Sequence, residues 1–232
     1  TITNNGILGA ATAVAGSGAT IYMINQSSAV GNSNVIFTGT GTTIFRRLYA
    51  DTNAGSFNVT FDQNVTFSPA STDPGIKLQN ASGVTATSAR SVTINAGKTV
   101  TIASGWFANN ATAFSGVDAN NTYNINGTLD ASAASIYFGC TSNSTADQRG
   151  TTNAQIINIG STGTLKCGSV VSVNKPLAGQ TLAVNVASGG TITYAGTAYQ
   201  TFPVANTFTV SSSPYALLTN NNSNLSFTSA SA

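Results

Sequence analysis

The sequence predicts an all-β chain, namely a parallel β-helix (solenoid) with irregular coils and loop insertions. Three observations favour this fold: apolar and polar residues alternate over strand-length segments, a turn-Thr-aliphatic unit recurs along the chain, and no segment has the length and periodicity of a helix. The alternative is a β-sandwich or jelly roll, because the same alternation also suits antiparallel strands.

The alternation is clearest in residues 91–105, "SVTINAGKTVTIASG". Val92, Ile94, Val100 and Ile102 alternate with Ser and Thr on both sides of an Asn-Ala-Gly-Lys corner. Side chains in a strand point to opposite faces with a period of two, so this segment reads as strand, turn, strand with one aliphatic face.

A turn followed by Thr, or once Asn, and an aliphatic residue recurs from "GSGATIY" to "ASGGTITY". Its aliphatic positions lie 23, 21, 35, 29, 36 and 27 residues apart, and they are Ile21, Ile44, Val65, Val100, Leu129, Leu165 and Ile192. Such steps are typical of solenoid coils whose loops vary in length. We therefore expect Val100, Leu129, Leu165 and Ile192 to form an aligned stack in the core.

A second mark is an aliphatic-Asn pair before the turn. The asparagines of these pairs are 31, 32 and 27 residues apart, at Asn95, Asn126, Asn158 and Asn185. Asparagine tolerates the left-handed backbone conformation and bonds neighbouring peptide groups, so we expect all four at solenoid corners.

We expect one domain over residues 1–232. Residues 17–205 should form the coils, residues 1–16 a donor strand or a cap, and residues 206–232 a C-terminal strand or cap. Each coil exposes an aliphatic face that only a neighbouring coil can bury, so the coils must stack as a single body.

Three segments resemble the coils of secreted bacterial β-helix surface proteins, of the filamentous-haemagglutinin and autotransporter-passenger type. They are "SVTINAGKTVTIASG", "INGTLDASA" and "INIGSTGTLKCGSVVSV", and the resemblance spans about residues 57 to 200. It implies a parallel β-helix with an adhesive or structural role at the cell surface.

Composition indicates which partners the chain suits. Only 6% of residues are charged, the net charge is +2, and no run of basic residues occurs. Nucleic acid is therefore an unfavourable partner, whereas a nearly uncharged surface favours self-association into a homopolymer. The sequence has no apolar stretch of membrane-spanning length. The start at Thr1 and the Thr- and Asn-rich composition suit an exported, extracellular protein at the cell surface.

Residues for catalysis are sparse. The chain has no histidine and no glutamate, which removes the commonest general base and the commonest transition-metal ligand. We expect no enzyme activity, cofactor or metal site. Cys140 and Cys167 are the only cysteines, and an even number in an exported chain favours a disulfide between them.

Two functions agree with these observations. The first is a structural subunit of an extracellular filament or surface layer, assembled by terminal strand addition or end-to-end stacking. The second is a surface adhesin or carbohydrate-binding β-helix, in which Trp106, Tyr194 and Tyr199 would contact glycans.

Overall fold

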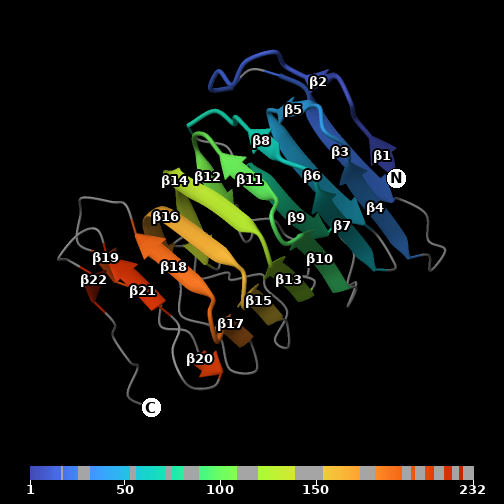
Figure 1. Cartoon of the computed structure of the whole chain (residues 1–232). Coiled ribbons are helices and arrows are strands. Elements are labelled where there is room, and N and C mark those ends of the chain that lie inside the picture. Colours follow the sequence, from blue (N-terminus) through green and yellow to red (C-terminus); the bar gives the residue numbers. More distant parts are fainter. Residues whose placement is uncertain are drawn as a thin grey trace, which may run out of the picture.

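The computed structural model is a parallel β-solenoid without helices in its described residues (Figure 1). The structure describes residues 1–16, 18–25, 32–52, 56–71, 75–80, 89–108, 120–138, 154–172, 181–194, 200–201, 207–211, 217–220 and 225–226. In this part of the chain no helix is long and apolar enough to cross a membrane. The prediction of a parallel β-helix is confirmed.

Two long sheets run along the stack. Among the described residues the first has eight strands, in spatial order β1 (Ile2–Thr3), β4 (Ser33–Thr38), β7 (Phe57–Asp62), β10 (Ala89–Ile94), β13 (Asn120–Ile125), β15 (Ala154–Ile159), β17 (Thr181–Ala187) and β20 (Thr207–Ser211). The second follows the order β2 (Ile7–Gly9), β5 (Thr42–Phe45), β8 (Val65–Phe67), β11 (Thr99–Ile102), β14 (Thr128–Phe138), β16 (Thr164–Ser172), β18 (Thr191–Tyr194) and β21 (Leu217–Asn220).

A third side is formed by shorter sheets. One contains β3 (Thr20–Asn25), β6 (Arg47–Thr52) and β9 (Ile76–Asn80), and another contains β19 (Gln200–Thr201) and β22 (Leu225–Ser226). Between them, β12 (Trp106–Ala108) pairs with the end of β14, which follows a register shift between Ala131 and Ser135. A coil such as β4, β5 and β6 thus contributes one strand to each side.

The corner in residues 95–98 joins two sheets rather than two strands of a hairpin. Val92 in β10 pairs in parallel with Val59 and Tyr123, whereas Val100 in β11 pairs with Val65 and Leu129. This pairing excludes the antiparallel sandwich alternative for this segment.

The core is made of columns of inward-facing side chains. The four residues predicted as a stack lie in register on neighbouring strands, in the order Val100, Leu129, Leu165 and Ile192. None of the four is more than 1% exposed. Because each one packs between two coils, the column provides hydrophobic stabilisation across the coils that it spans.

Two earlier members of the recurring unit lie outside this column. Ile21 is in β3 on the third side, where it pairs with Leu48. Ile44 pairs with Thr66 rather than with Val65, so it is one residue out of register. Ile21 packs against the core and Ile44 is buried, so these two copies of the unit lie in the solenoid but outside the predicted column.

In the last three copies of the recurring unit glycine directly precedes threonine, and the reason is steric. A Cβ at Gly127 would clash with the backbone oxygens of Lys98 and Asn95, and one at Gly163 would clash with that of Ile125. The corners of successive coils therefore stack at a distance that only glycine permits at these positions.

Residues 1–16 form the first coil of their own solenoid. β1 pairs with β4 and β2 pairs with β5, so the segment lies at the N-terminal end of the stack, and its role as a cap or a donor strand stays a prediction. At the other end, β20, β21 and β22 continue the stack within residues 206–232.

Candidate functional site

The first candidate site is the open edge at the N-terminal end of the stack, formed by β1, β2 and β3. Among the described residues, each of these strands pairs on one side only, with β4, β5 and β6 respectively. Figure 1 shows this edge at the blue end of the solenoid. An unpaired strand edge presents backbone N–H and C=O groups that can pair with another chain.

Exposed apolar side chains gather at the same edge. Of the five exposed large apolar residues in the described part of the chain, four lie within residues 1–25: Ile2, Ile7, Val14 and Tyr22. Ile7 is 68% exposed and Tyr22 is 57% exposed. No charged side chain occurs in residues 1–45, so nothing there repels a second uncharged surface.

Hydrogen bonds to β5 show which residues of β2 direct their N–H and C=O groups away from the stack. The Gly6 carbonyl accepts from Thr42 N at 2.8 Å, and Ala10 N donates to the Ile44 carbonyl at 2.9 Å, so both point toward β5. Since peptide groups alternate in direction along a strand, those of Ile7 and Gly9 point away from the stack. Ile7 thus offers an unpaired peptide and an exposed apolar side chain.

The second candidate site is a polar groove where the first and second sheets meet. It crosses three neighbouring corners, residues 39–41, 63–64 and 95–98, which join β4 to β5, β7 to β8 and β10 to β11. The middle corner has two residues and lies between corners of three and four, so it is recessed. The resulting cavity measures about 230 Å³.

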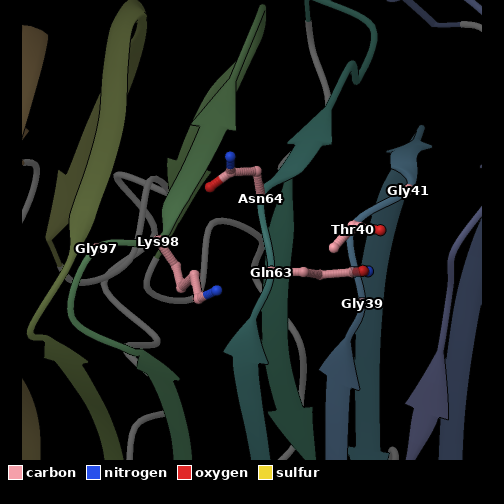
Figure 2. Close-up of a pocket in the computed structure, with 7 residues that line it drawn as sticks. All are labelled: Gly39, Thr40, Gly41, Gln63, Asn64, Gly97 and Lys98. Carbon is pink, nitrogen blue, oxygen red and sulfur yellow. The ribbon is translucent and has the colours of Figure 1, made fainter.

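The groove is lined by uncharged polar groups and one cation. Its lining comprises Gly39, Thr40, Gly41, Gln63, Asn64, Gly97 and Lys98. In Figure 2 the Lys98 side chain extends from its corner toward Gln63, and the Gln63 side chain extends toward residues 39–41. Lys98 is the one charged residue of this lining, and the carboxylate of Asp62 lies beside the groove, where its Oδ1 accepts from Asn95 Nδ2 at 3.0 Å.

Gln63 is a buried amide with an unmatched acceptor. It is 1% exposed, and its Nε2 donates to Thr43 Oγ1 at 2.8 Å. Its Oε1 has no hydrogen-bond partner in the structure. A buried acceptor without a donor is unfavourable, which makes Gln63 the most distinctive residue of the groove.

Asn64, in the middle corner, is held by a hydrogen bond from the next coil. Its Oδ1 accepts a hydrogen bond from Thr99 N at 2.8 Å, which fixes the side chain on the next corner. Asn64 and Thr40 are both exposed, so the Nδ2 amide of Asn64 and the hydroxyl of Thr40 lie on the solvent side.

Outside the groove, the outer face of the first sheet carries ladders of polar side chains. Asn158 Nδ2 donates to Asn124 Oδ1, and Asn185 Nδ2 donates to Asn158 Oδ1, both at 2.9 Å. Asn58 Nδ2 likewise donates to Asn34 Oδ1 at 2.8 Å. The amides bond to one another across coils, so they stabilise the stack.

The sequence-based prediction for the corner asparagines holds for two of four. Asn95 directly follows β10 and Asn126 directly follows β13, both at corners. Asn158 and Asn185 lie inside β15 and β17, so their predicted corner position is wrong. In the corner that contains Asn95, the residue with a left-handed backbone is Gly97, with φ of 73°.

The predicted disulfide is not formed at Cys167. Its side chain is a free thiol, 1% exposed and in register with Ala131. Burial raises the pKa of this thiol to about 12. The inward direction of the side chain explains the free thiol, because a bridge would have to enter the core. Cys140 lies outside the described residues.

The aromatic residues predicted to contact glycans are placed only by their backbones. Trp106 lies in β12, paired with Ser135, and Tyr194 lies in β18, paired with Cys167. Tyr199 lies outside the described residues. Their role toward glycans stays a prediction.

Asp130 forms an ion pair on the outer face of the second sheet. Its Oδ2 is 3.3 Å from Lys166 Nζ. Partial burial raises the pKa of the Asp130 carboxyl, but hydrogen bonds from Ser132 and the charge of Lys166 outweigh it and lower that pKa below its usual value. In the described part of the chain no three His, Cys, Asp or Glu side chains cluster as a metal site would require.

Comparisons with known proteins add no identity. No family model matches this chain, and neither does any curated protein or solved structure. The resemblance to secreted bacterial β-helix proteins therefore stays an expectation from the sequence.

Proposed function

We propose that this chain is a structural subunit that stacks end to end into an extracellular filament or surface layer. The observation that supports this most strongly is the open edge of β1, β2 and β3, with its exposed apolar residues and its lack of charge. Protein edges are normally blunted by charged residues or covered, and neither device is seen among the described residues of this edge.

The polarity of the stack supports a head-to-tail contact. The first sheet begins with β1 and ends with β20, and the second begins with β2 and ends with β21. If β1 and β2 of one copy pair with β20 and β21 of the next, all strands remain parallel. Such a contact joins two different surfaces and does not close on itself, so it propagates as a fibre.

The mode of contact follows from the first coil. Residues 1–16 pair with β4 and β5 of their own chain, so the proposed partner strand adds to the outer edge of this coil. End-to-end stacking is therefore favoured over exchange of a free N-terminal arm. An extracellular location agrees with a surface of hydroxyl and amide groups and only 6% charged residues.

Substitution of Ile7 by lysine tests the proposal. Ile7 is 68% exposed, so Ile7→Lys should leave the fold intact, while its charge at the edge blocks pairing with a second chain. We expect regular polymers of the wild-type chain by negative-stain electron microscopy, and monomers of the variant by light scattering.

Ile36→Lys is the matched control, because Ile36 is 38% exposed but lies in β4, where both edges are paired. This variant should still polymerise. The proposal fails if the wild-type chain stays monomeric, or if Ile7→Lys and Ile36→Lys polymerise equally well.

A further inference from the structure

The polar groove has the features of a binding site for one small, acidic, hydroxyl-rich ligand. Its position is separate from the open edge, because it crosses the corners that follow β4, β7 and β10, inside the stack. A contact at the outer side of β1, β2 and β3 leaves these corners accessible. The inference therefore does not depend on the proposed polymer.

Charge selects the class of ligand. Lys98 is the one charged residue among those that line the groove, and its side chain extends toward Gln63 (Figure 2). A carboxylate on the ligand would accept a charge-assisted hydrogen bond from Lys98 Nζ, which is about twice as strong as a neutral one. No carboxylate lines the groove, and the nearby carboxylate of Asp62 accepts hydrogen bonds from Asn95 Nδ2 and Thr38 Oγ1.

The other polar groups select hydroxyls. The Thr40 hydroxyl and the Asn64 amide lie on the solvent side of the groove and can donate to ring or hydroxyl oxygens. Gln63 Oε1 is a buried acceptor without a donor beneath these groups, and because Gln63 is 1% exposed, a ligand hydroxyl satisfies it only when the side chain turns toward the groove. A ligand with several hydroxyls and one carboxylate matches these groups.

Size restricts the ligand to a single ring. The cavity of about 230 Å³ is smaller than the roughly 300–1,000 Å³ of sites that enclose a drug-sized molecule. Its open side faces solvent, so further units of a chain could extend along the outer surface without entering it. We propose that the groove formed by residues 39–41, 63–64 and 97–98 binds one acidic sugar unit, that is, a polyhydroxylated ring with a carboxylate.

Saturation-transfer NMR with D-glucuronate and D-glucose as probes tests the proposal on the full chain. The two probes differ by one carboxylate, so glucuronate should bind saturably and glucose about tenfold more weakly or worse. Lys98→Gln should lower the affinity for glucuronate by about tenfold, since it removes the charge but keeps a polar side chain.

Lys166→Gln is the matched control, because it removes one positive charge from the outer face of the second sheet, outside the groove lining. It should leave glucuronate binding unchanged. The proposal is overturned if glucuronate does not bind, if glucose binds as tightly, or if the two lysine variants weaken binding equally.

Discussion

Leu165 shows how one residue of the recurring unit connects three coils. It pairs in register with Leu129 on one side and with Ile192 on the other, and it is 1% exposed. Its neighbour Thr164 points outward, where the hydroxyl remains half-buried on the surface of the second sheet. One adjacent pair thus provides both core packing and a polar outer face.

Replacement of Leu165 by alanine should lower the free energy of unfolding by about 2–4 kcal/mol, through lost burial and the cavity left between coils. Thr164→Ala, one residue away on the outer face, should change it by about 0.5 kcal/mol or less. Urea denaturation followed by circular dichroism measures both. Equal effects of the two variants would show that the column is not the main packing element.

Asp130 gives the chain a stability term that depends on pH. Its folded-state pKa is lowered by Ser132 and Lys166, so the ionised form is favoured by folding. The stabilisation is therefore present above the unfolded-state pKa of about 3.9 and is lost as pH falls through the lower folded-state pKa. Asp130→Asn should be less stable than wild type at neutral pH.

At a pH of about 2, both forms of residue 130 are neutral, and the difference in stability should largely disappear. Denaturation curves of the two proteins at neutral and acidic pH check this. A difference that stays constant over the whole range would mean that the lowered pKa of Asp130 does not contribute to stability.

At the residue scale, sequence reasoning succeeded where one aliphatic residue follows a Gly-Thr turn and failed where two aliphatics flank an asparagine. In "IINIG" both Ile157 and Ile159 face inward, and the register aligns Ile159 with Ile125. The prediction aligned the wrong member of the pair, which placed Asn158 at a corner. A period of two makes such an error of two residues easy, because both alignments keep the same face inward.

At the scale of elements, polar ladders hold neighbouring strands in register. Asn158 in β15 donates to Asn124 in β13 and accepts from Asn185 in β17, so one amide connects three strands. Stacked amides of this kind satisfy both the donor and the acceptor of each side chain within the ladder.

Asn158→Ala should therefore lower the free energy of unfolding by about 1–2 kcal/mol, because two hydrogen bonds of roughly 0.5–1.5 kcal/mol each are lost and the partner amides stay half-buried. Asn126→Ala is the control, since Asn126 is exposed and forms its hydrogen bonds through its backbone N–H and C=O, to the Ile94 carbonyl and from Thr162 Oγ1. A thermal or urea melt in which both variants lose the same stability would contradict the ladder's role.

Corners also explain why the groove was not predicted. The residues at 39–41, 63–64 and 97–98 are far apart in sequence, and the recess exists because a two-residue corner lies between longer ones. The lengths of two corners, between "FD" and "VTF" and between "SVTI" and "TVTI", could be read from the sequence. The register that brings these corners together was not, since it follows from pairing of distant strands.

At the scale of the whole molecule, all strands of the two long sheets point in the same direction, and the stack has two different ends. The sequence predicted the solenoid from its recurring unit. It did not show that residues 1–16 form the first coil, because a cap and a donor strand have the same alternation of side chains.

The axial rise per subunit in a polymer of this chain tests the central claim most directly. Eight strands per subunit in the first sheet, at about 4.8 Å each, give a rise of about 38 Å when subunits stack end to end. Cryo-electron microscopy of the polymers should show this rise, with strands perpendicular to the fibre axis and sheets continuous across the junction. Polymers whose strands run along the axis, or whose sheets are interrupted between subunits, would contradict the account.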